Sequence, residues 1–534
     1  MIRISDIKIP AAPQEAEWAA LEDKMQQWLG EKPRIWRVAR HSLDARKKPE
    51  IFSVYALDLD LGSPKQEEAF LWRKRKLKAA VIREKAYNPP RYSGRDSAQV
   101  IVVGAGPAGL FAALNLAWAG LRPLLIEQGA PVEERQKDVE TFWQGEALKP
   151  WSNVQFGEGG AGTLSDGKLS SGIRDKEGRI SYMLEAFIRA GAPERIRWEA
   201  KPHIGTDVLR QVVKGLREEL LAAGGSIRFH TRMTDLLLAD GRVKGIAVQD
   251  TKTGDCQTLP ADALVLAPGH SARGLFRLLQ EKGVPMEAKP FAMGLRIQHP
   301  QAQINALQYG ANPPGYLPAA DYKLTARASD SRGVYSFCMC PGGYVVNASS
   351  EEGRLCVNGM SEAARDGENA NAALVVQIRP EDTASAGLFG GLLLQEKWEA
   401  AAWQLGEGKI PLQLWEDFAA GRPSGALGAV QPACKGAWQM TDISGTLPDY
   451  AARALREAMP QFDQTLPGFG RRDSLLCGIE SRTSSPLRIL RNERGESKIK
   501  GLFPCGEGAG YAGGITSAAV DGMRAAEAVT ASLV

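Results

Sequence analysis

A glycine-rich turn between a strand-like and a helix-like segment is the clearest candidate for binding chemistry in this sequence. Residues 104–109 read GAGPAG and directly follow the apolar run 99–103, and a second apolar run over 123–126 ends at Glu127. In the GxGxxG pattern the first glycine permits a tight turn, the second lets backbone approach a pyrophosphate, and the third lets helix and strand pack closely. The first turn of the following helix offers unpaired N–H groups to phosphates. We therefore expect a dinucleotide site, with Glu127 accepting hydrogen bonds from ribose hydroxyls.

The C-terminal segment indicates which dinucleotide this is. Residues 501–510 (GLFPCGEGAG) and 513–519 (GGITSAA) resemble the second FAD fingerprint of flavoproteins, in which an acid after glycine holds the ribityl chain. Here that acid is Glu507, where aspartate is commoner. The helix beginning near Thr516 would direct its N-terminus at the flavin ring. Residues 263–270 (ALVLAPGH) resemble the A-T-G strand of the same proteins. The sequence therefore predicts FAD as the cofactor.

A third glycine-rich loop follows at 156–168, and it is expected to run beside the pyrophosphate and the flavin ring. The 57 glycines of this 534-residue chain cluster in 104–109, 157–172 and 501–522, the segments proposed to touch the cofactor. The alternative for the third loop is a flexible surface segment, and for Lys168 a solvent-exposed lysine. The residues expected to bind FAD are Gly104, Ala105, Gly106, Pro107, Ala108, Gly109, Glu127, Gln128, Gly159, Gly160, Gly162, Thr163, Lys168, Ala267, Gly269, Gly506, Glu507, Gly514, Ile515 and Thr516.

Candidate catalytic groups are fewer. Glu480 and Arg482 lie in a dense polar run before the last FAD segment and could supply an acid and an anion clamp, or alternatively structural ion pairs. Residues 337–344 (FCMCPGGY) are expected to form a tight turn, whose cysteines could face the flavin or lie in the core. No C-x-x-C occurs, so a dithiol of the thioredoxin kind is not expected. No metal site is expected, because C-x-C has no second pair of ligands.

Composition excludes several classes of protein. The net charge is +4 and 44% of residues are hydrophobic, so neither a disordered chain nor a strongly basic nucleic-acid binder is indicated. Seven irregularly spaced cysteines do not make a disulfide framework. The first residues form no apolar signal region, and no apolar stretch is long enough to span a membrane. We expect a cytoplasmic protein, and the oligomeric state is open.

Periodicity divides the chain into four segments. Residues 1–95 predict a small α+β domain of ferredoxin-like type with a linker, including strands near 2–9, 34–42 and 51–59 and a helix over 13–29. Strand-like and helix-like runs then alternate, which indicates a Rossmann-like α/β FAD-binding domain with a parallel sheet. We expect its first part at 96–285, an inserted α+β substrate domain at 286–474, and its second part at 475–534.

The long strings over 153–169, 337–349, 478–489 and 504–514 resemble a largely uncharacterised family of bacterial FAD-dependent dehydrogenases. The Gly506-Glu507 pair also resembles bacterial flavoproteins with an inserted β-domain. The resemblance implies an FAD domain split by a substrate domain and preceded by a small appendage. It implies no particular substrate.

These features together predict an FAD-dependent oxidoreductase that transfers hydride between flavin N5 and a small molecule. The electron donor is open between transiently bound NAD(P)H and another reductant. Reaction at a C–C bond is favoured only by analogy with reductases of similar layout. One alternative is a flavin monooxygenase. Another is an RNA-associated flavoprotein, because the N-terminal domain carries the basic run 73–78 near Trp72, although a solvated face explains that run as well.

Overall fold

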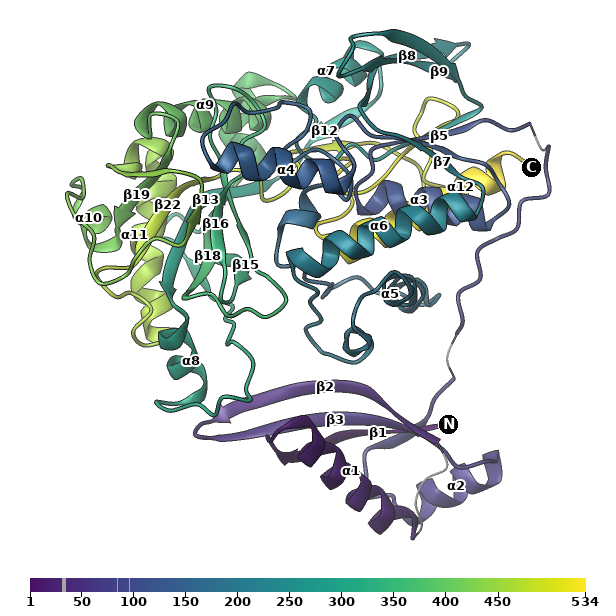
Figure 1. The fold of residues 1–534 in the computed structure, drawn as a ribbon, viewed down its shortest axis with the longest axis vertical. Helices are drawn as coiled ribbons and strands as arrows, with labels where there is room; N and C mark the ends of the chain where they lie inside the picture. Colours follow the sequence, from purple (N-terminus) through teal and green to yellow (C-terminus); the bar gives the residue numbers. More distant parts are fainter. Residues whose placement is uncertain (31–34, 84, 96) are drawn as a thin grey trace.

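The N-terminal part is a four-stranded antiparallel sheet with the order β2-β3-β1-β4, which is the ferredoxin-like arrangement (Figure 1). The computed structural model describes residues 1–30, 35–83, 85–95 and 97–534, so residue 34 of the expected strand 34–42 and residue 96 of the expected FAD-binding part lie outside the described residues. The elements are β1 (Ile2–Pro10), α1 (Gln14–Leu29), β2 (Ile35–Lys47), β3 (Glu50–Asp60), α2 (Pro64–Arg73) and β4 (Ala79–Val81).

The side-chain alternation of β1 explains how this small sheet makes a core. Ile2 and Ile4 are buried, and a bulge with Asp6 at φ 59° then shifts the register so that Ile7 and Ile9 are buried too. Without the extra residue these last two isoleucines would alternate to the solvent face. The four isoleucines pack against Leu21 and Met25 of α1, among other residues.

The FAD-binding part is built on a five-stranded parallel sheet with the order β24-β11-β5-β6-β7. Its elements in the first half of the chain are β5 (Val100–Val103), α3 (Pro107–Trp118), β6 (Leu124–Ile126), α4 (Val132–Trp143), α5 (Arg179–Arg189), α6 (Thr206–Ala222), β7 (Ser226–Arg228), β11 (Ala263–Leu266) and α7 (Arg273–Glu281). Near the C-terminus it gains β24 (Leu502–Pro504) and α12 (Ile515–Ser532). The Rossmann-like fold expected from the sequence is confirmed.

Two different layers cover this sheet. Val100 and Val102 of the central strand β5 face α3, α5, α6 and α12 on one side. Ile101 and Val103 face the other side, where an antiparallel sheet of β8 (Thr231–Ala239), β9 (Arg242–Asp250) and β10 (Cys256–Pro260) packs with α7. The alternation of segments did not predict this antiparallel sheet, because periodicity shows where strands lie and not which neighbours they pair with. β5 is thus buried on both faces, as its unbroken apolar sequence indicates.

The inserted part is a seven-stranded sheet with the order β14-β15-β18-β13-β22-β19-β21. Its elements are β13 (Phe291–Pro300), α8 (Gln301–Tyr309), β14 (Thr325–Arg327), β15 (Gly333–Cys340), β18 (Asn369–Ile378), α9 (Gly390–Leu405), β19 (Ile410–Leu414), α10 (Trp415–Ala420), β21 (Trp438–Met440), α11 (Asp449–Thr465) and β22 (Leu475–Glu480). A small sheet of β16 (Tyr344–Asn347), β17 (Val357–Met360) and β20 (Cys434–Lys435) adjoins it, and β12 (Met286–Ala288) pairs with β23 (Leu487–Ile489). β22 follows the expected boundary at 474/475 but is hydrogen-bonded between β13 and β19.

The N-terminal part contacts both of the others, as the lower part of Figure 1 indicates. The His41 amide of β2 donates to the Trp198 carbonyl of the FAD-binding part at 2.7 Å, and the Ala200 amide donates back to the His41 carbonyl at 2.8 Å. On the inserted part, the Tyr316 hydroxyl donates to the Ala11 carbonyl at 2.7 Å. Within the described residues, no helix has both the length and the apolar character needed to cross a bilayer.

Candidate FAD site and its neighbouring side chains

The GxGxxG turn has the geometry that its glycines predict. Gly104 adopts φ 98°, and a Cβ there would lie 2.3 Å from the Ala267 carbonyl oxygen of the neighbouring strand end. A Cβ on Gly109 would lie 1.7 Å from the Gly104 carbonyl oxygen, so α3 packs directly on the turn. A Cβ on Gly106 would meet nothing nearer than the Gly160 Cα at 3.9 Å. The turn is therefore closed behind Gly104 and Gly109 and open in front of Gly106, where a pyrophosphate would approach.

Glu127 joins this turn to the third glycine-rich loop. One carboxylate oxygen accepts from the Ala105 amide at 2.9 Å, and the other accepts from the Gly129 and Gly157 amides at 3.0 and 3.1 Å. The carboxylate is nearly buried. Two oxygens offer about four acceptor positions, so three backbone bonds leave room for one ribose hydroxyl. Glu127 thus orders two loops as well as being the expected ribose ligand.

A buried arginine that we did not single out from the sequence orders the third loop. The Arg135 guanidinium donates to the carbonyls of Asn153, Val154, Glu158 and Gly160 at 2.7–2.9 Å. A Cβ on Gly157, which has φ 125°, would lie 2.3 Å from the Arg135 side chain. The glycines of this loop therefore serve two purposes, because they allow left-handed backbone and leave space for the arginine.

The C-terminal segment completes the arrangement. The Gly506 amide donates to Asp521 of α12 at 2.8 Å, and Arg491 donates to the same carboxylate at 2.7 and 3.0 Å. Gly513 and Gly514, immediately before α12, have no atom within 4 Å of a Cβ position. The α12 N-terminus therefore has free space before it, as an anion-binding helix end requires.

The remaining expected FAD residues hold the loops together or lie at their edges. The Thr516 hydroxyl donates to the Leu169 carbonyl at 2.7 Å, and the Thr163 hydroxyl to the Glu158 carbonyl at 3.4 Å. The side chains of both threonines thus have partners in the protein, which leaves backbone groups for the cofactor. Gln128 is half-buried beside Glu127, and Ile515 is buried at the start of α12. Gly269, after the β11 end, adopts φ 73° with nothing within 4 Å of its Cβ position.

These features fit FAD. The turn at 104–109, the Gly269 turn and the Gly506–Glu507 segment follow β5, β11 and β24, which are adjacent in the parallel sheet. Ligands of such sheets bind outside the carboxyl ends of the strands. The open space at Gly106 suits a pyrophosphate, and Glu127 suits a ribose. The open α12 N-terminus suits the electron-rich edge of a flavin ring.

Charged groups gather where the FAD-binding part meets the inserted sheet. The Lys168 ammonium lies 2.5 Å from Asp166 and donates to the Met339 carbonyl of β15. It is half-buried, which differs from the exposed lysine that the sequence also allowed. Burial raises the pKa of Glu507 to about 7, against the attraction of the Lys289 ammonium, and the Cys338 sulfur raises it further. Cys338 therefore lies within electrostatic reach of both Lys168 and Glu507.

The C-x-C sequence forms a bulge at the end of β15, so the expected turn is confined to Pro341 and Gly342. Phe337 pairs with Ala373 and Cys340 with Asn371, which leaves one extra residue on β15. Cys338 has φ 43° and is half-buried, Cys340 is fully buried, and Phe337 is 39% exposed. A hydrogen bond with Cys340 lowers the pKa of Cys338 to about 5 despite burial, and Lys168 and Arg296 add to the effect. These neighbours favour the charged form of the Cys338 thiol.

Glu480 forms a buried ion pair behind this bulge. Arg296 of β13 donates to both of its carboxylate oxygens, at 2.9 and 3.1 Å, and is itself fully buried. The same guanidinium donates to Asn371 at 2.7 Å and to the Cys338 carbonyl and Asn358 at 3.2 Å. Burial raises the pKa of Glu480, and Arg296 offsets this only in part. The expected acid is therefore the carboxylate of a structural pair adjoining Cys338.

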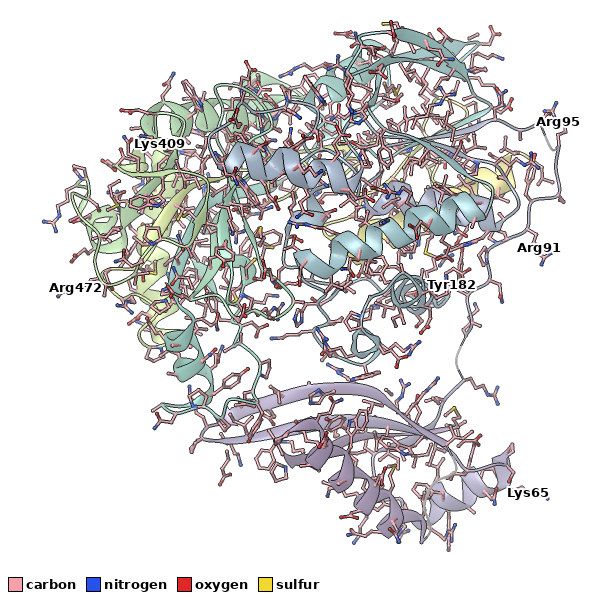
Figure 2. All side chains as sticks on the ribbon, viewed as in Figure 1. Lys65, Arg91, Arg95, Tyr182, Lys409 and Arg472 are labelled. Carbon is pink, nitrogen blue, oxygen red and sulfur yellow. The ribbon has the colours of Figure 1, made fainter. Side chains whose placement is uncertain are left out.

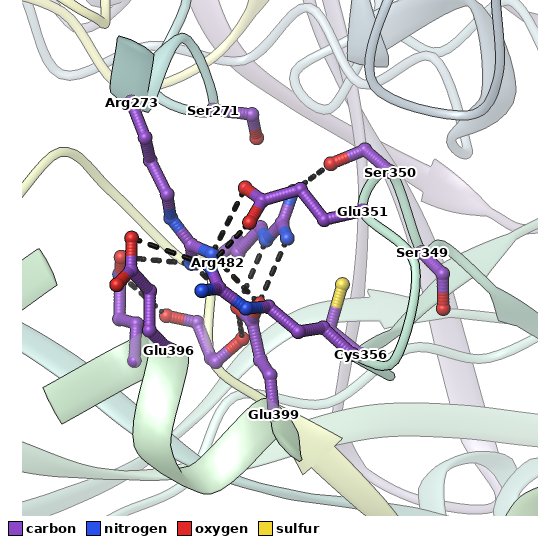
Figure 3. Close-up of polar contacts among 12 residues, drawn as sticks. Ser271, Arg273, Ser349, Ser350, Glu351, Cys356, Glu396, Glu399 and Arg482 are labelled. Atoms are coloured by element: carbon purple, nitrogen blue, oxygen red, sulfur yellow. Dashed lines mark hydrogen bonds and ion pairs between the residues drawn. The ribbon is translucent and has the colours of Figure 1, made fainter. Parts of the chain in front are cut away.

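Arg482 belongs to a separate cluster, shown in Figure 3. It donates to both oxygens of Glu399 at 2.8 and 2.9 Å, and Arg273 of α7 donates to the same two oxygens at 2.8 and 2.9 Å. Ser481 adds a fifth bond at 2.6 Å. Because α7 is part of the FAD-binding part and Glu399 lies on α9, the cluster joins the two parts. This geometry matches the ion-pair alternative for Arg482, and we do not propose it as an anion clamp.

Several of these residues carried no local signal. Arg135 lies in a charged helix where an arginine is normally exposed, and Asp521 lies within an ordinary helical pattern. Arg296, Arg273 and Glu399 find their partners far away along the chain. Cys338 was considered only together with its turn.

Comparisons with known proteins agree with this geometry. The family described as "FAD-dependent protein, C-terminal domain-like" matches residues 290–483, and the family "Pyridine nucleotide-disulphide oxidoreductase" matches residues 98–296. An uncharacterized protein of Clostridium beijerinckii is 45% identical over 499 residues, which cover 92% of this chain and 91% of that protein.

Solved structures show only distant similarity. The FrdA subunit of E. coli quinol fumarate reductase is 14% identical, with a TM-score of 0.38, over 82% of this chain and 70% of its own. A geranylgeranyl bacteriochlorophyll reductase-like protein of Thermoplasma acidophilum is 15% identical, with a TM-score of 0.36, over 81% of this chain and 78% of its own. Such values support no statement about the reaction. From the matching families and the Clostridium relative, the chain belongs to a family of FAD-dependent proteins of the oxidoreductase class.

Proposed function

We propose that the chain transfers hydride between the N5 atom of FAD and a small molecule bound where the FAD loops meet the end of β15. The observation that carries the proposal is the convergence of groups from two parts of the chain. Lys168 and Glu507 come from the FAD-binding part, whereas Cys338 comes from the inserted sheet. Cys338 acts electrostatically on both, and Lys168 donates to the carbonyl of Met339, the next residue to Cys338. Substrate sites of this kind combine an apolar wall with a few placed polar groups. The exposed Phe337 side chain offers the apolar surface.

Each of these residues has a proposed role. Bound FAD supplies the two-electron chemistry, and the chain supplies binding, orientation and charge. Glu507, with a pKa of about 7, holds or releases a proton at its carboxyl oxygen near neutral pH. Burial opposes the charge of Lys168, but Cys340, Asp166 and Cys338 raise the pKa above its ordinary value, so the residue stays cationic. It can therefore stabilise negative charge on a bound substrate or on the reduced cofactor.

The electron donor is tested by anaerobic mixing of the FAD-loaded protein with NADH and with NADPH, followed by reoxidation with fractionated cell extract. We expect bleaching of the flavin absorbance with one nicotinamide and reoxidation by a small-molecule fraction. Reoxidation by oxygen alone, with a hydroxylated product, would instead identify a monooxygenase.

The cofactor site is tested by Gly106→Val. A Cβ at this position has room in the protein, so the variant is expected to fold, but the added side chain would project to where the pyrophosphate lies. We expect loss of bound FAD, by at least tenfold in flavin-to-protein ratio, with an unchanged circular dichroism spectrum. Gly425→Val is the matched control, because a Cβ there meets nothing within 4 Å and the residue lies outside the expected FAD loops. Full FAD content in the Gly106 variant would contradict the proposed site.

We do not propose an RNA-associated function. The basic run 73–78 begins at the C-terminal end of α2, the helix whose first turn carries Lys65 in Figure 2. This helix lies on the side of the N-terminal part that faces away from the FAD-binding part. A basic surface so placed would not guide a nucleic acid to the cofactor. Neutralising Arg73–Lys78 should therefore leave flavin reduction unchanged.

A further inference from the structure

We propose that Asp166 positions the Lys168 ammonium beside the flavin, and that Arg365 of the inserted part holds Asp166 in place for this purpose. The positive charge that the FAD-binding part presents to the cofactor then depends on a side chain from the other part of the chain. This rests on the proposed function, in which Lys168 stabilises negative charge on the reduced cofactor or on the substrate. It adds two positioning residues that have no role in the hydride transfer described above.

Asp166 is a buried carboxylate with two cationic neighbours. The Arg365 guanidinium donates to both of its oxygens, from Nε at 2.9 Å and also from Nη2, and the Lys168 ammonium lies 2.5 Å from one of them. The Asp166 side chain is only 1% exposed, so water does not compete for these contacts. Burial opposes the charge of Asp166, but Lys168 and Arg365 outweigh burial and lower its pKa. One ionised carboxylate therefore fixes two cations.

The main chain explains how Arg365 reaches a loop of the FAD-binding part. The segment 361–365 of the inserted part lies against Gly205, just before α6. A Cβ on Gly205 would lie 2.2 Å from the Ala363 nitrogen, so only glycine permits this approach. The Gly205 amide also donates to the Asp166 carbonyl at 3.2 Å. The same glycine thus brings together Asp166 and the segment that carries Arg365.

Two further contacts fix the position of Lys168. Its ammonium donates to the Met339 carbonyl in the bulge of β15. The carbonyl of the next residue, Leu169, accepts from the Thr516 hydroxyl at 2.7 Å, in the first turn of the helix α12 that is expected to face the flavin ring. Among the described residues, Asp166 and Met339 accept two of the three N–H groups of the ammonium, which leaves the third for a ligand.

A second buried aspartate of the FAD-binding part shows what distinguishes Asp166. Asp138 of α4 also lies 2.5 Å from a lysine ammonium, that of Lys149, and accepts from the Ser152 hydroxyl at 2.6 Å. Both partners belong to the FAD-binding part, and Lys149 is exposed. Asp166 differs because its arginine comes from the inserted part and its lysine lies in a loop expected to border the flavin.

The test is the ratio of reduced to oxidised FAD in the loaded protein at equilibrium with a redox dye of known potential. In Lys168→Met the reduced cofactor loses a neighbouring positive charge, so this ratio should fall about tenfold, which corresponds to about 30 mV for a two-electron couple. In Asp166→Asn, charge and positioning predict opposite signs. Removal of a negative charge alone would raise the ratio, whereas loss of the held ammonium lowers it. We expect a fall of about threefold.

Two further variants separate positioning from charge. Arg365→Lys keeps the positive charge but loses the two-point contact that a guanidinium makes with a carboxylate, so the ratio should fall about twofold. This variant carries the test if Asp166→Asn does not fold. The double variant of Asp166→Asn and Lys168→Met should fall no further than Lys168→Met, because Asp166 acts through the lysine. Asp138→Asn is the matched control and should leave the ratio unchanged.

The outcomes separate this proposal from the proposed function. Protein that binds no FAD would overturn the proposed function. An unchanged ratio in Lys168→Met would overturn the role of Lys168 in that function, and its positioning with it. A fall in Lys168→Met, together with a rise or no change in both Asp166→Asn and Arg365→Lys, would overturn the positioning alone.

Discussion

Glu399 and Glu480 are both buried carboxylates paired with arginine, yet burial and charge act on them with opposite results. Glu399 accepts five hydrogen bonds, from Arg273, Arg482 and Ser481, whereas Glu480 accepts two, both from Arg296. Burial opposes the charge of Glu399, but its two guanidinium groups outweigh burial and hold its pKa well below the ordinary range. With a single arginine, burial prevails and the pKa of Glu480 is raised. The number of donors, and not burial itself, decides whether a buried carboxylate holds its charge.

The largest expected effect is a loss of stability in the variant Glu399→Gln. Two buried arginines then lose their counter-charge, and breaking a buried pair in this way costs about 3–5 kcal/mol. Urea unfolding of the FAD-loaded protein should show this loss. The control is Glu351→Gln, whose partly exposed carboxylate also contacts Arg273, at 3.1 Å, and should cost at most about 1 kcal/mol. Equal losses of unfolding free energy in the two variants would contradict the central role of Glu399 in the cluster.

Glu480→Gln should cost less than Glu399→Gln. Arg296 keeps Asn371, Asn358 and the Cys338 carbonyl as acceptors, so its guanidinium retains partners when the carboxylate is removed. We expect a loss of about 1.5–3 kcal/mol in the same urea unfolding, which is the range for a hydrogen bond to a charged group. A loss larger than that of the Glu399 variant would contradict the comparison.

Acidification should change the contributions of Glu399 and Glu480 to stability in opposite directions. The lowered pKa of Glu399 contributes stability above its unfolded pKa of about 4.3, and this is lost as pH falls below that value. The raised pKa of Glu480 contributes stability that is present below the unfolded pKa and is lost as pH rises through the folded one. As pH falls from 7 to 4, wild type should therefore gain stability relative to Glu480→Gln, and as pH falls further below about 4.3 it should lose stability relative to Glu399→Gln. Unfolding free energies of the three proteins across this range provide the check.

The smallest expected effect is on the Cys338 thiol. Its charge and that of Glu480 repel each other, so Glu480→Gln should lower the pKa of Cys338 below its value of about 5. The shift should be a few tenths of a pKa unit, because Arg296 screens the carboxylate. It is measured as the pH midpoint of iodoacetamide alkylation of peptide 333–354. Glu351→Gln, in the other cluster, should leave that midpoint unchanged.

The two carboxylates also show how far the sequence alone can reach. The turn at 104–109 was predictable, because its chemistry is contained in six consecutive residues and an adjoining helix. Glu480 and Arg482 were recognised as a polar run, but their partners Arg296 and Glu399 lie 184 and 83 residues away. No feature of the nearby sequence indicates that Glu480 and Arg482 belong to different clusters. Such pairings come from sheet order, which periodicity does not specify.

The same reason explains β22 and Cys338. β22 is a strand in any interpretation of residues 475–480, but its place between β13 and β19 depends on how the chain returns across the inserted sheet. The pKa of Cys338 is lowered by Cys340, two residues away in the bulge of β15, and also by Lys168, from a loop 170 residues earlier in the chain. The cofactor was therefore predictable from the sequence, whereas the reactive side chains beside it required the fold.

The contacts of the N-terminal part limit how the two larger parts can move. The main-chain bonds of His41 fasten β2 to the FAD-binding part, and the Tyr316 hydroxyl fastens the inserted part to Ala11 of the same small domain. A rigid rotation that separated the two parts would have to break one of these contacts, as well as the Glu399 cluster on α9. The small N-terminal domain thus links the FAD-binding part to the inserted part and restrains their relative motion. Substrate must then reach the end of β15 through movements of loops and side chains, while the two larger parts keep their relative positions.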